Sequence, residues 1–125
     1  MNKNRHIKNV AIIGSGIMGS RIACHFANIG VDVLLLDIIP TDMSKEEKDP
    51  TKRNSIVNTA LKDTLKSKPS PIYSKNFISR ITTGNLEDDI QRISEADWII
   101  EVVVEKIGIK KKVFEKIDKY RKREP

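Results

Sequence analysis

The sequence has little cysteine and no long hydrophobic run. Its one cysteine, Cys24, excludes an internal disulfide and fits a reducing compartment, so we expect a cytoplasmic protein. No apolar stretch approaches the roughly 20 residues that a membrane-spanning helix needs, so we expect no membrane partner. Residues 1–9 are basic without an apolar core, which is not typical of a secretory signal. With no repeats, the 125 residues amount to one domain or part of one.

Basic charge is in excess only near the C-terminus. The net charge is +6, but residues 106–125 carry nine basic and three acidic side chains, whereas residues 1–105 are balanced. A nucleic-acid-binding fold presents its basic residues over one face, so this distribution predicts no nucleic-acid partner. The adjacent Cys24 and His25 lack the second ligand pair of a metal site, so we also expect no metal.

Residues 10–37 form the most informative stretch, because they read as strand, turn, helix and strand. Residues 10–13 are an apolar run typical of a buried parallel strand, and residues 14–19 then fit G-x-G-x-x-G. Apolar residues at helical spacing follow, and Gly30 stands where a helix C-cap belongs. A second apolar run ends at Asp37. This order is the βαβ unit that binds dinucleotides.

Each glycine of the motif predicts a contact with a nucleotide or with the fold. Gly14 permits the tight turn, Gly16 lets a pyrophosphate approach the backbone, and Gly19 lets the helix lie close to the sheet. The free N–H groups of the helix start would bind the phosphates. Asp37 lies 18 residues after Gly19, near the roughly 20 expected for the carboxylate that binds the adenine ribose.

The same carboxylate predicts NAD rather than NADP as the cofactor. A 2′-phosphate beside Asp37 would meet a like charge, at a cost of about 4 kcal/mol at 4 Å and an effective dielectric of 20. The residues that we predict to bind the cofactor are Gly14, Ser15, Gly16, Ile17, Met18, Gly19, Asp37 and Ile38.

The rest of the chain continues the alternation of strands and helices. Asp49 and Pro50 read as the start of a helix over 51–67, which is a helical excursion before the third strand. Strands at 80–83 and 98–104 follow, with Trp98 expected in the core. Helices are expected at 86–93, with Asn85 as the N-cap, and at 109–121. These elements predict an α/β fold, namely an incomplete Rossmann-type, doubly wound parallel sheet in the strand order 3-2-1-4. The open flank of the fourth strand makes a homo-oligomer possible.

The chain resembles the NAD-binding domain of 3-hydroxyacyl-CoA dehydrogenases. The resemblance extends from residue 8 to residue 121, and three features carry it. They are G-x-G-x-M-G at residues 14–19, Asp37 followed by a long helical segment, and A-D-x-x-x-E-x-x-x-E at residues 96–105 followed by Lys110 and Phe114.

The resemblance implies NAD-dependent interconversion of 3-hydroxyacyl-CoA and 3-oxoacyl-CoA, which is a step of fatty-acid β-oxidation. It places Glu105 and Lys110 near the nicotinamide-side ribose and phosphates. Because the helix after the second strand contacts coenzyme A in that family, Lys66 and Lys68 are candidates for binding the CoA phosphates of an acyl-CoA substrate.

The chain lacks the catalytic part of that family. The family's catalytic His, its Glu partner, the substrate-binding Ser and Asn and the helical domain all come later than any residue here, and neither His6 nor His25 matches the catalytic His. We therefore expect no catalytic residue in this chain, with residues 1–125 forming the N-terminal part of an NAD-binding domain and the C-terminal catalytic and dimerisation domain absent. Two alternatives stay open, a non-catalytic NAD-binding or NAD-sensing module and a Rossmann dehydrogenase of another small hydroxy acid.

Overall fold

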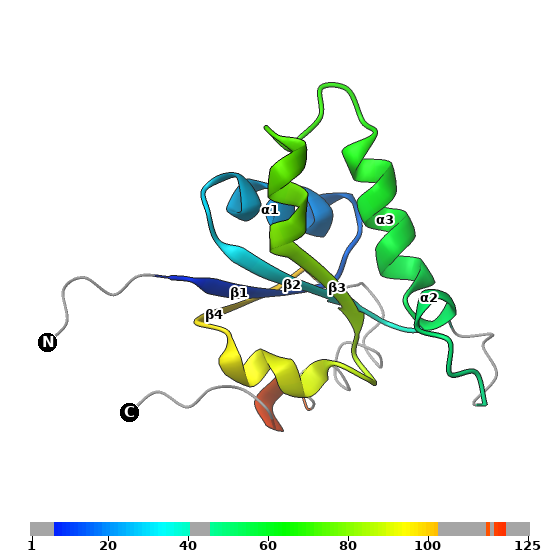
Figure 1. The fold of residues 1–125 in the computed structure, drawn as a ribbon. Helices are drawn as coiled ribbons and strands as arrows, with labels where there is room; N and C mark the ends of the chain where they lie inside the picture. Colours follow the sequence, from blue (N-terminus) through cyan, green and yellow to red (C-terminus); the bar gives the residue numbers. More distant parts are fainter. Residues whose placement is uncertain (1–6, 41–45, 103–114, 116, 120–125) are drawn as a thin grey trace, which may run out of the picture.

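The computed structural model describes residues 7–40, 46–102, 115 and 117–119, which build a parallel sheet covered by helical segments (Figure 1). Its four strands lie in the order β3-β2-β1-β4, and every pairing is parallel. This confirms the predicted fold class and strand order. The strands are β1 (Asn9–Ile13), β2 (Asp32–Asp37), β3 (Ile81–Asn85) and β4 (Trp98–Glu101).

One face of the sheet is covered by two helices, α1 (Ile17–Asn28) and α3 (Ser55–Leu65) (Figure 1). α1 ends as predicted, because Ile29 is its C-cap and Gly30 follows with a φ of 90° that a residue with a side chain rarely adopts. Alternate residues of β1 and β2 point at these helices and form a buried apolar cluster with them. Its most buried members are Val10, Ile12, Ala23, Cys24, Ala27, Val33, Leu35 and Val57.

The segment after β2 differs from the single helix predicted over 51–67. Asp49 does cap a helix start, since its carboxylate accepts a hydrogen bond from the Thr51 N–H at 3.0 Å. That helix, α2 (Pro50–Arg53), stops after one turn at Asn54, and α3 begins at the next residue. The Asn54 side chain accepts a hydrogen bond from Asn85 at 2.7 Å. A long-range contact of this kind leaves no trace in local periodicity, so the sequence pattern missed the interruption.

The other face of the sheet is covered differently from the prediction. No α-helix forms over 86–93; a turn is followed by the 3₁₀ segment η2 (Ile90–Glu95). Another 3₁₀ segment, η1 (Lys75–Arg80), precedes β3 but lies on the α1 face, where Phe77 packs against the first apolar cluster. A second apolar cluster lies on the η2 face, and it consists of Ala11, Ile13, Leu36, Leu86, Ile90, Ile93, Ala96 and Ile117. The predicted helix 109–121 lies mostly outside the described residues, although Ile117 is helical and fully buried in this cluster.

Trp98 was also expected in the core, and this prediction was wrong. The residue begins the edge strand β4 and is 51% exposed, with its ring packed edge-on against Phe26 at a centroid distance of 6.2 Å.

Among the helices that the structure describes, none is long and apolar enough to cross a bilayer.

Candidate functional site

The turn between β1 and α1 is shaped by backbone that approaches backbone. Gly14 has a φ of 107°, and a Cβ added to it would lie 2.2 Å from the carbonyl oxygen of Val102, beyond the end of β4. A Cβ on Gly19 would lie 1.8 Å from the carbonyl oxygen of Gly14. Both positions therefore exclude any side chain. At Gly14 the positive φ and the nearby backbone both exclude it, and at Gly19 the nearby backbone does so alone.

Gly16 differs from these two glycines, because a Cβ added there would meet no atom of the described part of the chain within 4 Å. It is the N-cap residue of α1 and is exposed, with extended ψ and no side chain to cap the helix. The first N–H groups of an α-helix have no partner within the helix and carry partial positive charge. The fold would accept a larger residue at position 16. A glycine there is useful instead for an anion, which can approach the helix start closely when no side chain is in the way.

A carboxylate lies directly beside this turn. Asp37 ends β2, and its Oδ2 accepts hydrogen bonds from the Ser15 N–H at 2.8 Å and from the Ser15 hydroxyl at 2.5 Å. Its Oδ1 accepts from the Ile38 N–H at 2.7 Å. The structure thus joins the glycine turn to the acidic residue that the sequence places 18 positions after Gly19.

A cavity of about 420 Å³ opens next to the start of α1. Gly16, Ile17 and Arg21 line it from the side of α1. α3 and the residues just after it contribute Ala60, Asp63, Thr64 and Ser67. Ile17 and Met18 are 76% and 66% exposed, which is unusual for large apolar side chains at a helix start and leaves both available for contact.

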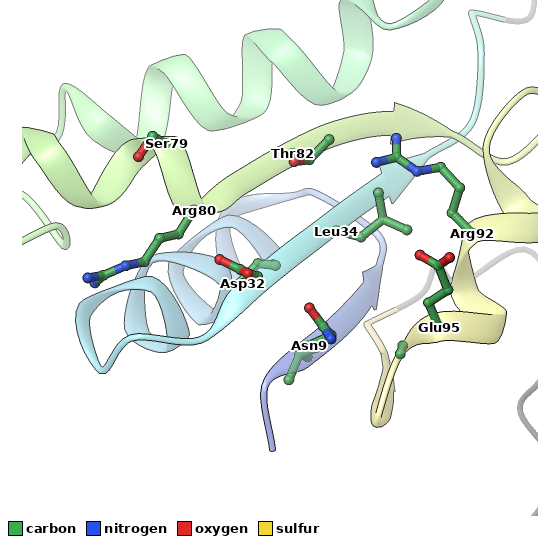
Figure 2. A pocket seen from close by; sticks show the side chains of 11 residues that line it. Asn9, Asp32, Leu34, Ser79, Arg80, Thr82, Arg92 and Glu95 are labelled. Atoms are coloured by element: carbon green, nitrogen blue, oxygen red, sulfur yellow. The ribbon is translucent and has the colours of Figure 1, made fainter. Parts of the chain in front are cut away.

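Another cavity, of about 320 Å³, lies at the opposite end of the sheet (Figure 2). Asn9 and Asp32, which begin β1 and β2, line it together with Arg80, Arg92 and Glu95. Its two cations and two carboxylates are mixed, and Arg80 is already used, because its guanidinium donates to the carbonyl oxygen of Ala27 at 2.6 Å near the end of α1. This cavity therefore offers neither the free N–H groups nor the glycine of a phosphate site.

Polar residues gather at the end of β3 in a group that we name the Asn85 cluster, which comprises Arg53, Asn54, Asn85 and Asp88. The sequence predicted the capping role of Asn85 but missed the rest of the group. The Asn85 side chain, 1% exposed, accepts from the Glu87 and Asp88 N–H groups and donates to Asn54 and Asp88. The Arg53 guanidinium binds both carboxylate oxygens of Asp88, at 2.7 and 3.0 Å.

The Asn85 cluster borders the site, because Asn85 is in register with Asp37 and the Leu86 N–H donates to the Asp37 carbonyl at 3.0 Å. Hydrogen bonds from Arg53 and then from Asn85 hold the pKa of Asp88 below its usual value, and the bond to Asp88 raises the pKa of Arg53. The sequence signals the cap that Asn85 forms, but no periodic pattern or motif signals the contact of Asn85 with Asn54 or that of Arg53 with Asp88.

The remaining predicted residues lie at the end of α3 or outside the described residues. Lys66 and Lys68 are exposed, at and just beyond the C-terminal end of α3. Glu105 and Lys110 belong to a part of the chain that the structure does not describe. His25 is exposed on α1 and lines a surface groove that also includes Ile17, Met18 and Ile22.

The fold and the turn define the chain as a dinucleotide-binding domain of the Rossmann type. The family model for "3-hydroxyacyl-CoA dehydrogenase, NAD binding domain" matches residues 9–124. The chain therefore belongs to this family, and NAD is the cofactor of the family, as the sequence predicted.

Individual relatives agree with this assignment. A probable 3-hydroxyacyl-CoA dehydrogenase of Bacillus subtilis is 53% identical over 95% of this chain, and one of Deinococcus radiodurans is 36% identical over 90%. The solved structure of 3-hydroxybutyryl-CoA dehydrogenase from Escherichia coli is 26% identical over 94% of the chain, with a TM-score of 0.57. The chain spans only 16%, 31% and 23% of these three proteins.

Proposed function

We propose that this chain holds NAD within a 3-hydroxyacyl-CoA dehydrogenase, which oxidises 3-hydroxyacyl-CoA to 3-oxoacyl-CoA in fatty-acid β-oxidation. The observation that carries the proposal is the open space at Gly16. Gly14 and Gly19 pack so closely against backbone that the fold itself requires them, whereas none of the described residues fills the space where a side chain of residue 16 would stand. A pyrophosphate bound at the start of α1 would use that space.

The substrate class rests on the relatives. Their names support a 3-hydroxyacyl-CoA as the substrate of the whole protein. Because this chain spans less than a third of each of these relatives, the residues that act on the substrate would belong to the rest of such a protein. The part played by residues 1–125 would then be to bind the cofactor.

The chain's own residues would bind and orient the cofactor. The backbone of Gly16, Ile17, Met18 and Gly19 would receive the pyrophosphate at the helix start, and Asp37 with Ile38 would bind the adenine ribose. Gly14 and Ser15, whose N–H groups donate to Leu36 and Asp37, would shape the turn around the cofactor. Bound NAD would supply the acceptor for the hydride that leaves the substrate's hydroxyl-bearing carbon. Glu105 and Lys110 remain predicted contacts on the nicotinamide side.

Further partners follow from the same assignment. Lys66 and Lys68, exposed at the end of α3, are proposed to meet the CoA phosphates of an acyl-CoA substrate. A homo-oligomer, with β4 near the contact, and a cytoplasmic location are proposed as well.

Calorimetric titration of the purified chain with NAD and NADP tests the cofactor proposal. We expect NAD to bind more tightly than NADP, and we expect no hydride transfer from a 3-hydroxyacyl-CoA by this chain alone. Tighter binding of NADP would contradict the role of Asp37, and turnover would contradict the absence of catalytic residues. NAD-dependent binding of a protein partner without turnover would favour a sensing module.

Thermal unfolding with and without acetoacetyl-CoA tests the lysine proposal. We expect CoA to raise the melting temperature, and we expect Lys66→Ala with Lys68→Ala to abolish this shift. Lys62→Ala, which changes an exposed lysine of α3, is the matched control and should keep the shift. Equal melting temperatures with and without the ligand would remove Lys66 and Lys68 from the site.

A further inference from the structure

The Asp37 carboxylate is held by three hydrogen bonds from the protein itself. The Ser15 N–H and the Ser15 hydroxyl both donate to Oδ2, and the Ile38 N–H donates to Oδ1. An ionised carboxylate has about four lone-pair sites, two on each oxygen. Oδ2 is therefore saturated by Ser15, and the remaining acceptor site lies on Oδ1.

The Ser15 hydroxyl cannot exchange its bond to Asp37 for a hydrogen bond to water. Ser15 is fully buried, and the hydroxyl of Ser20, also fully buried, donates to its carbonyl oxygen. A buried hydroxyl that lost Asp37 would bear the cost of an unmade hydrogen bond, so the pair is expected to persist when a ligand binds. This contact depends on the residue between the first two glycines of the motif, where the motif itself allows any side chain.

We propose that Ser15 is a positioning residue for the cofactor, acting through Asp37. Its hydroxyl fixes the orientation of the carboxylate, so that Oδ1 receives a ribose hydroxyl and the negative charge opposes a 2′-phosphate. The inference rests on the proposed function, because it assumes that the chain binds NAD. It adds a residue that determines the preference for NAD over NADP.

A double-mutant cycle on nucleotide binding tests this role. The dissociation constants for NAD and NADP are measured by calorimetry for the wild-type chain, Ser15→Ala, Asp37→Ala and the double variant. We expect Ser15→Ala to weaken NAD binding about fivefold to tenfold and to reduce the preference for NAD, as loss of a charge-assisted hydrogen bond would. In the Asp37→Ala background, we expect the same substitution to change NAD binding less than about twofold.

Ser20→Ala is the matched control, because it removes an equally buried hydroxyl from the same turn without touching Asp37. We expect its effect on NAD binding to be the same with and without the Asp37 carboxylate, and circular dichroism confirms that each variant is folded. If Ser15→Ala leaves NAD binding unchanged, or weakens it equally in both backgrounds, the inference is overturned while the proposed function stands. A folded wild-type chain that does not bind NAD overturns both.

Discussion

Two neighbouring regions at the carboxyl ends of the strands hold their shape in opposite ways. The glycine turn (residues 14–19) is held by close packing of backbone against backbone, since added side-chain atoms would overlap the backbone at Gly14 and Gly19. The Asn85 cluster is held by side-chain hydrogen bonds, since the Asn85 amide group alone makes four of them. A larger residue at either of these two glycines should therefore destabilise the turn, whereas a smaller side chain at Asn85 should destabilise the cluster.

The largest effect is expected from Gly14→Ala. The substitution forces a left-handed φ on alanine and drives its Cβ to 2.2 Å from a backbone oxygen, so we expect a loss of more than about 3 kcal/mol of stability. Gly30→Ala is the control, because Gly30 has a similar φ but open space, and it should cost only about 1–2 kcal/mol. Urea unfolding followed by circular dichroism measures both. Equal losses would show that the contact with Val102 is unimportant.

The Asn85 cluster is tested by removing atoms. Asn85→Ala leaves the Glu87 and Asp88 N–H groups without their acceptor in a partly buried turn, so we expect a loss of about 2 kcal/mol in the same urea assay. Asn76→Ala, at an exposed position, should change stability by less than about 0.5 kcal/mol. A loss at Asn85 no larger than that at Asn76 would mean that the cluster does not stabilise the end of β3.

The two regions also differ in how far the sequence predicts them. Motif spacing predicts the glycine turn, the strand order and the nearness of Asp37 to the turn. A turn with no room for side chains needs glycines, and glycines are visible in the sequence. The break at Asn54 lies beside contacts between residues about 30 positions apart, which join Asn54 to Asn85 and Arg53 to Asp88. Such contacts have no local period, and Ser15, although predicted to lie at the site, gave no sign of its bond to Asp37.

Gly16→Ala separates folding from binding within the glycine turn. Since the added Cβ meets no atom within 4 Å among the residues that the structure describes, we expect stability to change by less than about 1 kcal/mol. We expect NAD binding to weaken by at least about tenfold, or about 1.4 kcal/mol, because the methyl group would hold the pyrophosphate away from the backbone. Calorimetry with NAD and urea unfolding measure the two effects. Unchanged NAD affinity would place the pyrophosphate elsewhere.

The smallest effect is expected from the ion pair at the edge of the Asn85 cluster. Arg53 lowers the pKa of Asp88, so the native chain keeps this carboxylate charged at pH values where the unfolded chain protonates it. The stabilisation is therefore present above the ordinary aspartate pKa of 3.8 and is lost as the pH falls through the lower native value. We expect Arg53→Met to lower the melting temperature slightly at neutral pH, and we expect this difference to shrink in acid to what the Arg53 hydrogen bond to the Glu47 carbonyl contributes.

The control for the ion pair is Lys52→Met, next to Arg53 in α2. Lys52 is 63% exposed and lies 3.8 Å from the Glu47 carboxylate, so its removal should lower the melting temperature less than Arg53→Met at neutral pH. Melting curves between neutral pH and strongly acidic pH, each at low and high salt, make the comparison. High salt should shrink the Arg53 effect less than the Lys52 effect, because the Arg53 side chain is only 15% exposed and binds both oxygens of Asp88. A difference for Arg53→Met that persists unchanged below the native pKa of Asp88 would show that Arg53 acts through its packing and its bond to the Glu47 carbonyl rather than through Asp88.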